Sequence, residues 1–199
     1  SKRPRILIGK DTRKSGDMLE AALTAGLCSM GAKVIPLGVV PTPAVAYLTR
    51  YYKADAGVVI SASHNPCEYN GIKFFNSDGY KLSDGIENEI ESYILGEKAI
   101  EELPTHGKVG YVSANHNAVE DYVAFAVSTI DCRLDGMKIA VDCANGASYE
   151  TAFKALNKLG ANVEAIHNTP DGVNINHMCG STHMEVYRLT LLQSVRTSV

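Results

Sequence analysis

The chain has 199 residues, of which 45% are hydrophobic and 21% charged, and its formal net charge is −3 at pH 7. This is the composition of an ordinary globular protein, and the charge offers no basic surface to a nucleic acid. No apolar run approaches the roughly 20 residues that cross a bilayer, so we expect neither a nucleic-acid partner nor a membrane. The five cysteines include no C-x-x-C pair, which favours free thiols in the reducing cytoplasm.

The N-terminal part of the chain alternates between strand and helix patterns. We expect strands at 5–9, 33–37 and 57–60, and helices from Ser15, as N-cap, to Gly31 and over 42–53. This order favours a parallel sheet with right-handed crossovers. Pro36 suggests that the second strand ends early or lies near an edge. A strand at 71–76 follows a short connection and should therefore be antiparallel.

The next segment predicts a helix from a cap at Ser83 to about Leu95, loops over 96–116 and a helix over 119–130. The first of these helices has apolar side chains that we expect to face inward, namely Ile86, Ile90, Tyr93 and Ile94. The first helix of the chain should likewise bury Met18, Leu19, Ala22, Leu23 and Leu27.

The pattern restarts after 131–136. A strand is expected at 138–142, a helix at 149–159, a strand at 162–166, a polar loop at 167–182 and a last helix from about His183. We therefore predict an α/β fold, with a mixed, mainly parallel sheet carrying helices on both faces in domain 1–133, followed by a second, incomplete α/β unit at 134–199. A two-stranded unit should expose an apolar edge and favour a homo-oligomer or a domain swap.

The hexapeptide S-A-S-H-N-P at 61–66 follows a buried strand pattern directly. Ser63 would lie at the ligand-facing end of a parallel sheet, with His64 and Asn65 as hydrogen-bond donors beside it. Lys73 could act as a charge clamp or as an acid/base group. This combination suits a serine that carries a phosphoryl group, although the composition alone is more typical of a polar turn without chemistry.

A second polar loop, G-K-D-T-R-K-S-G at 9–16, also lies between a strand and a helix. Both loops should meet at one edge of the sheet, where Arg13 could clamp a phosphate bidentately. A charged loop with a capping serine is the simpler interpretation of this segment taken alone. The coincidence of the two loops is what argues for a site.

These segments resemble the α-D-phosphohexomutase superfamily over roughly residues 3–185. S-A-S-H-N-P and N-G-I-K-F-F, at 61–66 and 70–75, are similar to its phosphoserine loop, and 9–16 to its early loop. V-D-C-A-N-G-A, N-I-N and C-G-S-T-H, which begin at 141, 174 and 179, resemble the phosphoglucosamine mutase branch.

The resemblance implies a reaction and roles for residues. A phosphoserine at Ser63 would interconvert glucosamine 6-phosphate and glucosamine 1-phosphate through a bisphosphate intermediate, for UDP-N-acetylglucosamine and cell-wall precursor synthesis. Lys73 would be the acid/base group, and His64 and Arg13 would be active-site residues. Asn65, in the same loop, would be a cofactor-binding residue. Mg²⁺ would bind the phosphate on Ser63.

The aspartate ligands that the family uses for magnesium are missing, since the chain contains no D-x-D. We therefore expect this chain alone to have little or no mutase activity. A phosphomannomutase or phosphoglucomutase stays open as an alternative, as does an inactive binding domain that keeps the loop. A metal cluster of His177, Cys179 and His183 is less favoured than a polar loop, because its spacing is not an established zinc pattern.

Overall fold

The computed structural model describes residues 3–100, 102–115 and 117–184. Its larger sheet has the strand order β4-β3-β1-β2-β5, built from β1 (Arg5–Lys10), β2 (Lys33–Val39), β3 (Ala56–Ile60), β4 (Ile72–Asn76) and β5 (Tyr111–Val112). All neighbours in it are parallel except β3 and β4, which are antiparallel. The mixed, mainly parallel α/β sheet predicted from the sequence is confirmed.

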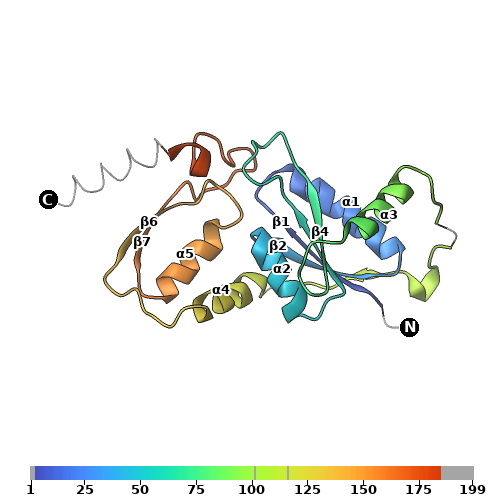
Figure 1. Ribbon diagram of the computed structural model, residues 1–199, viewed down its shortest axis with the longest axis horizontal. Helices are drawn as coiled ribbons and strands as arrows, with labels where there is room; N and C mark the ends of the chain where they lie inside the picture. Colours follow the sequence, from blue (N-terminus) through green and yellow to red (C-terminus); the bar gives the residue numbers. More distant parts are fainter. Residues whose placement is uncertain (1–2, 101, 116, 185–199) are drawn as a thin grey trace.

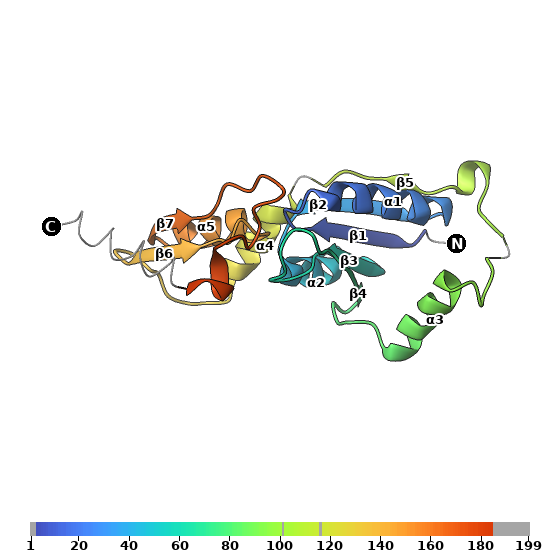
Figure 2. The same cartoon turned by 90° about the horizontal axis from the view of Figure 1, so that it is seen from above.

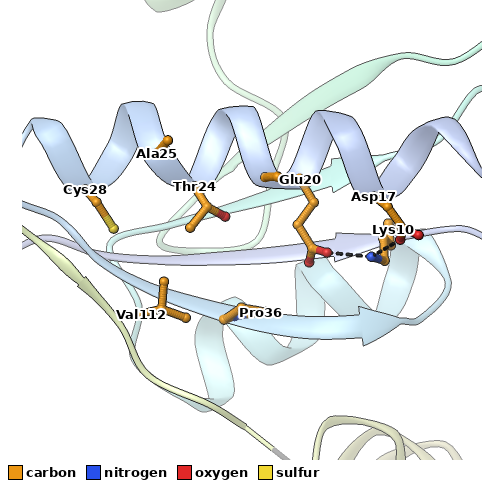
Figure 3. A pocket seen from close by; sticks show the side chains of 9 residues that line it. Lys10, Asp17, Glu20, Thr24, Ala25, Cys28, Pro36 and Val112 are labelled. Carbon is orange, nitrogen blue, oxygen red and sulfur yellow. Dashed lines mark hydrogen bonds and ion pairs between the residues drawn. The ribbon is translucent and has the colours of Figure 1, made fainter.

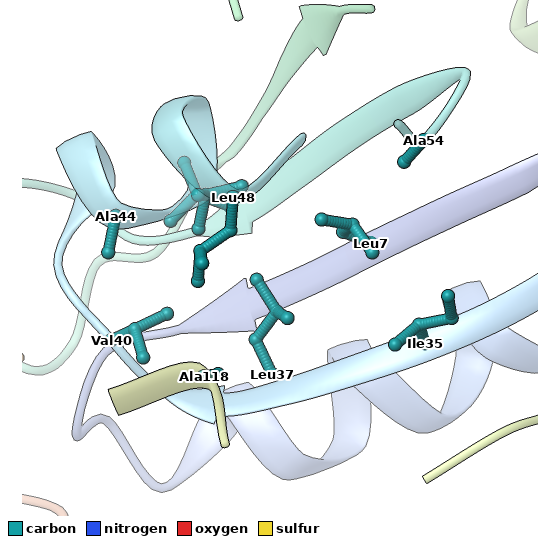
Figure 4. Packing of buried hydrophobic residues seen from close by; sticks show 10 residues of the cluster. Leu7, Ile35, Leu37, Val40, Ala44, Leu48, Ala54 and Ala118 are labelled. Carbon is teal, nitrogen blue, oxygen red and sulfur yellow. The ribbon is translucent and has the colours of Figure 1, made fainter. Parts of the chain in front are cut away.

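Helices cover both faces of this sheet. Figure 2 shows α1 (Ser15–Ser29) on one face and α2 (Thr42–Tyr51) on the other. Because successive strand residues point to opposite faces, Leu7 packs on the α2 side and Ile8 on the α1 side. The α2 side holds the larger cluster of buried side chains, which Figure 4 shows between the strands and α2. Burial of this apolar surface stabilises the sheet, and the candidate site lies at the carboxyl ends of its strands.

A close approach of α2 to β3 requires a glycine. A Cβ on Gly57 would lie 2.1 Å from the Oγ1 atom of Thr49. That hydroxyl is buried and donates to the Val45 carbonyl at 2.7 Å. Only a residue without a side chain allows the helix and the strand to pack this closely.

Three details of the first helix and second strand differ from expectation. Lys14, not Ser15, precedes α1, and the Ser15 hydroxyl instead accepts a hydrogen bond from Asn70 at 2.9 Å. Leu19, Leu23 and Leu27 pack inward, but Met18 and Ala22 are exposed. The second strand does not end early at Pro36, since it continues to Val39, but it does lie near the edge, where β5 pairs only with its first two residues.

The segment between the sheet and the second unit also differs. Ser83 occupies the N-cap position of helix α3 (Asp84–Ile94), but its side chain makes no capping hydrogen bond; the helix buries no residue and stands apart from the sheet in Figure 2. The inward face predicted for it is therefore wrong, and Ile94 is 76% exposed. The expected loop at 96–116 contains a 3₁₀ turn (His106–Lys108) and the edge strand β5.

The second unit follows α4 (Ala118–Ser128) and contains β6 (Lys138–Asp142), α5 (Tyr149–Lys158), β7 (Asn162–Ile166) and a 3₁₀ turn (Gly180–Thr182). β6 and β7 form a separate parallel two-stranded sheet, as expected, and lie beside the larger sheet in Figure 1. The division at residue 133 and the predicted association stay predictions.

Helix α4 joins the two units. The Tyr52 hydroxyl donates a hydrogen bond to Asp121 of α4, and Lys154 of α5 forms an ion pair with Glu120 at 2.6 Å. The last predicted helix, beyond Met184, lies outside the described residues. Within the part of the chain that the structure describes, no helix has the length and apolar character needed to span a bilayer.

Candidate active site

The two polar loops meet at one edge of the sheet, as the sequence predicts. β1 and β3 are parallel neighbours, so their carboxyl ends lie side by side. The Asp11 N–H donates to the Ile60 carbonyl at 3.0 Å, which ties the start of the first loop to the end of β3. We call residues 61–66 the serine loop.

Ser63 is an exposed residue of the serine loop with an unusual backbone conformation. Its φ is 57°, in the left-handed region that non-glycine residues seldom adopt. The Ser63 N–H donates to the Ser61 hydroxyl at 3.3 Å, and the Asn65 N–H donates to the Ala62 carbonyl at 3.2 Å. The side chains of Ser63, His64 and Asn65 are exposed. A short, internally bonded turn thus presents the serine hydroxyl to solvent.

A titratable partner lies next to the hydroxyl. The Ser63 Oγ atom is 3.5 Å from Nδ1 of His64. At this distance a small rotation brings the two atoms into a good hydrogen bond, and a neutral imidazole can accept the serine proton. Burial and the Glu68 carboxylate raise the pKa of the neighbouring Cys67 thiol, which lowers the fraction of reactive thiolate there.

Arg13 is held inside the edge and does not project toward solvent. Its side chain is 0% exposed and forms an ion pair with Asp11, whose side chain is 3% exposed. The Nη2 atom donates to the carbonyls of Asn65 and Ser63, at 2.5 and 3.3 Å. With these partners Arg13 holds the serine loop from below, and the contacts give no support to the predicted phosphate clamp.

Lys73 lies on β4, opposite Val59 of β3, on the α2 face of the sheet edge. Its side chain is exposed and, within the described residues, makes no hydrogen bond or ion pair. It is therefore a free cation one strand away from the serine loop. The structure brings Arg13, Ser63, His64 and Asn65 together, whereas no hydrogen bond or ion pair joins Lys73 to them within the described residues.

The second unit contacts both loops. The Asn176 amide donates to the carbonyls of Ser63 and Asn65, at 3.1 and 3.0 Å. The Thr12 hydroxyl donates to the Asn145 carbonyl at 2.5 Å, and the Lys14 N–H donates to the Gly172 carbonyl at 2.9 Å. The edge that carries Ser63 is thus also the place where the second unit docks.

A cluster of possible metal ligands lies in the second unit, where the loop over 167–182 meets β6. Ligand atoms of Asp142, His167 and Cys179 lie within 4.8 Å of one another. However, Oδ1 of Asp142 accepts from the Ala144 N–H at 2.8 Å and lies 3.0 Å from Nδ1 of His167, and Oδ2 accepts from the Gly180 N–H at 2.9 Å. These bonds fasten the loop over 167–182 to β6 and occupy the carboxylate that a metal would need.

A surface groove with a volume of about 650 Å³ lies along α1, and none of the residues that line it belongs to the serine loop. Figure 3 shows Lys10 in it, between Asp17 and Glu20, at 2.6 and 2.5 Å. Burial opposes the charge on Lys10, but the hydrogen bonds to the two carboxylates outweigh it and raise the pKa of the ammonium. Lys10 is the one cation among the residues that line the groove, and two carboxylates already pair with it, so the groove gives no support to a phosphate site.

Sequence reasoning missed two of the residues that shape the site, Asp11 and Asn176. The D-x-R spacing in the first loop is a usable signal for a carboxylate paired with Arg13. Asn176 is separated from Ser63 by 113 positions, and no local pattern indicates that contact.

Comparison with known proteins identifies the family. The model of the family described as phosphoglucomutase/phosphomannomutase, alpha/beta/alpha domain I, matches residues 1–101. A phosphoglucosamine mutase of Acetivibrio thermocellus is 60% identical over 191 residues, which are 96% of this chain and 42% of that protein. One from Clostridium acetobutylicum is 62% identical over 183 residues, covering 92% of this chain and 41% of that protein.

A solved structure agrees with these sequence relatives. A phosphoglucomutase/phosphomannomutase family protein from Burkholderia thailandensis superposes with a TM-score of 0.68 and 26% identity, over 85% of this chain and 37% of that one. The chain thus spans about two fifths of the length of the curated relatives that it matches. It belongs to the phosphoglucomutase/phosphomannomutase family.

Proposed function

We propose that this chain carries the phosphoserine of a phosphoglucosamine mutase, with Ser63 as the phosphoryl acceptor and donor. The observation that carries the proposal is the exposed Ser63 hydroxyl, held in a left-handed turn at the carboxyl end of β3. The curated relatives that are about 60% identical bear that enzyme's name, which favours glucosamine phosphates over other hexose phosphates.

The phosphoryl transfer balances as an exchange between two oxygens. The Ser63 Oγ atom attacks one phosphorus of a glucosamine bisphosphate, the bond from that phosphorus to the sugar oxygen breaks, and the sugar oxygen gains a proton. The serine proton passes to a base. In the opposite direction a monophosphate takes the group from Ser63 at its free hydroxyl. The two half-reactions convert glucosamine 6-phosphate and glucosamine 1-phosphate into each other.

The surrounding residues support distinct roles in this proposal. His64 lies beside the hydroxyl and can exchange the serine proton. Lys73, exposed on β4, can act as acid/base for the sugar hydroxyl when a bound substrate lies between it and the serine loop. Asn65 offers its exposed amide to phosphate oxygens, and Arg13 acts from beneath through the loop carbonyls.

Magnesium is part of the proposal only through the phosphate of Ser63, whose oxygens are the hard ligands that this ion prefers. The described residues of the edge do not complete a site for it. The carboxylate of Asp11, in the neighbouring loop, is occupied by the side chain and N–H of Arg13. The chain contains no D-x-D, so we assign the ion no protein ligand within this sequence.

Because no protein ligand for the ion is assigned within this sequence, we expect the chain alone to exchange one phosphoryl group with a bisphosphate but not to catalyse repeated turnover. A phosphorylated hexosamine is the proposed partner, and the five free thiols are compatible with the cytoplasm. The alternatives are a phosphomannomutase or phosphoglucomutase, whose names other family members bear, and an inactive binding domain.

A single-turnover experiment tests the proposal. The chain is incubated with glucosamine 1,6-bisphosphate, and phosphorus NMR follows the monophosphates and a protein-bound phosphate ester. We expect monophosphate release in proportion to protein phosphorylation, and neither product with Ser63→Ala. Faster loading from mannose or glucose bisphosphate would favour the alternative enzymes. Absence of any transfer would favour the binding domain. Sustained turnover would refute the expectation that the chain alone is not a complete mutase.

A further inference from the structure

We propose that Asn176 is a positioning residue for Ser63. Its side-chain amide, presented by the second unit, holds the carbonyls of the serine loop and so fixes the conformation that exposes the hydroxyl. The docking of the second unit is thereby built into the geometry of the phosphoryl acceptor. This inference rests on the proposed function only for its phosphoryl-transfer measurement.

The geometry uses both hydrogens of one amide group. Nδ2 of Asn176 lies 3.1 Å from the Ser63 carbonyl and 3.0 Å from the Asn65 carbonyl, and an amide nitrogen carries two N–H donors. Nη2 of Arg13 reaches the same two carbonyls. Since each carbonyl oxygen has two lone pairs, it can accept both donors at once. One donor comes from each unit, and together they hold the two ends of the turn.

Those carbonyls matter because Ser63 is in a strained conformation. A serine at φ 57° leaves the left-handed region readily unless neighbouring groups hold it. Fixing the Ser63 carbonyl fixes the orientation of the following peptide, and fixing the Asn65 carbonyl closes the turn. Ser63 is then kept exposed, with its hydroxyl oxygen 3.5 Å from Nδ1 of His64.

Asn176 is itself well held. Its φ is 58°, and its N–H donates to the Ala144 carbonyl at 2.9 Å. The adjacent Ile175 and the nearby Cys179 are buried, at 3% and 0% exposure. Asparagine tolerates the left-handed region better than most residues. Asn176 and Ser63 thus both have a strained backbone, and the side chain of the first binds the loop of the second. Strained residues cluster in this way at functional sites.

The consequence is a coupling between the second unit and Ser63. Arg13 belongs to the same unit as the serine loop and stays with it in any movement. Asn176 leaves with the second unit, so a rotation that separates the two units removes one of the two donors from each carbonyl. The serine loop is then free to leave its reactive conformation.

Two substitutions remove the amide donors of Asn176 with residues that accept its left-handed backbone. Asn176→Asp places a carboxylate opposite the two carbonyls, and Asn176→Gly removes the side chain and relieves the left-handed backbone. Met178→Gly is the matched control, because Met178 has φ 52° in the same loop and an exposed side chain. Circular dichroism and melting show which variants are folded, and the glycine variant decides the result if the aspartate variant unfolds.

The measurement is made on the 199-residue chain by carbonyl ¹³C NMR, with amide exchange over the serine loop. We expect both Asn176 variants to shift the Ser63 and Asn65 carbonyl resonances upfield and to exchange loop amides about tenfold faster, as the loss of two modest hydrogen bonds implies. Phosphoryl transfer from glucosamine 1,6-bisphosphate should slow by a similar factor. Met178→Gly should resemble the wild type in all three measurements.

Unchanged carbonyl resonances and unchanged exchange in folded Asn176→Gly would overturn the inference. An equal effect of Met178→Gly would also overturn it, because the loop fold and not the amide would then be responsible. If the wild-type chain takes no phosphoryl group, the proposed function fails, while the carbonyl resonances still decide the role of Asn176.

Discussion

Replacing Arg13 with methionine tests whether this residue is a structural support or a phosphate clamp. Methionine keeps an unbranched apolar stem but removes the charge and all donors. The substitution leaves Asp11, 3% exposed, without its cation, and it takes a donor from the carbonyls of Ser63 and Asn65. Breaking a buried ion pair by removing one partner costs about 3–5 kcal/mol, so we expect Arg13→Met to lose that much of the free energy of unfolding.

Urea unfolding of the chain measures this loss, with two matched comparisons. Arg133 pairs with Asp135 over the same sequence spacing, but both side chains are more than half exposed, so Arg133→Met should change stability little. The double variant Asp11→Asn, Arg13→Met removes the stranded charge and should recover part of the loss.

The support account is refuted if Arg13→Met costs less than about 1 kcal/mol, the usual range of an exposed pair, while phosphoryl transfer to Ser63 is lost. That combination would make Arg13 a group that acts on the phosphate. A large loss of stability that the double variant partly restores is the result that the buried ion pair predicts.

Three further substitutions test the framework of the edge. Gly57→Ala forces a methyl group against the Thr49 hydroxyl and should cost about 1–3 kcal/mol, with part recovered by Thr49→Ala; equal losses in the single and double variants would contradict this packing. Leu48→Ala opens a cavity beneath α2, where Leu48 is fully buried, and should cost about 2–5 kcal/mol in urea unfolding; a loss below that range would show that the site collapses. Burial and the hydrogen bond to Asp121 raise the pKa of Tyr52 to about 12, above the unfolded value of about 10. The stability from this raised pKa is present below pH 10 and is lost as pH rises toward 12, so the advantage of the wild type over Tyr52→Phe should shrink in that window, and a constant difference would refute the assignment.

The sheet was predictable because its signals are local. Buried strand patterns alternate with helix patterns before Ile60, and the short link to 71–76 indicates an antiparallel neighbour. The restart after 131–136 gives β6, α5 and β7 within one or two residues of their observed bounds. Such segments carry their own periodicity and need no distant partner to be recognised.

The errors lie where tertiary contact decides. The apolar side chains of α3 have helical spacing, but the described part of the chain provides no surface against which they are buried. β5 has two residues, too few for a pattern, and exists because β2 has an open edge. A hydrophobic pattern predicts that burial of a face is favourable, but it does not predict that a packing partner is present.

The candidate site shows the same limit. Its loops and Ser63 follow from strand ends, which the sequence reveals. The burial of Arg13 does not, since a charged side chain in a polar loop is usually exposed. The contact of Asn176 with the serine loop depends on how the second unit docks, and neither loop alone encodes it.

The most direct test of the account is to locate the phosphoryl group that the chain takes up. The chain is incubated with glucosamine 1,6-bisphosphate, and tandem mass spectrometry maps the modified peptide in the wild type, in Ser63→Ala and in Ser77→Ala, an exposed serine in the turn after β4. The account predicts one phosphoryl group, on Ser63, in the wild type and in Ser77→Ala, and none in Ser63→Ala. Phosphorylation that persists in Ser63→Ala, or that maps to another residue in the wild type, would contradict it.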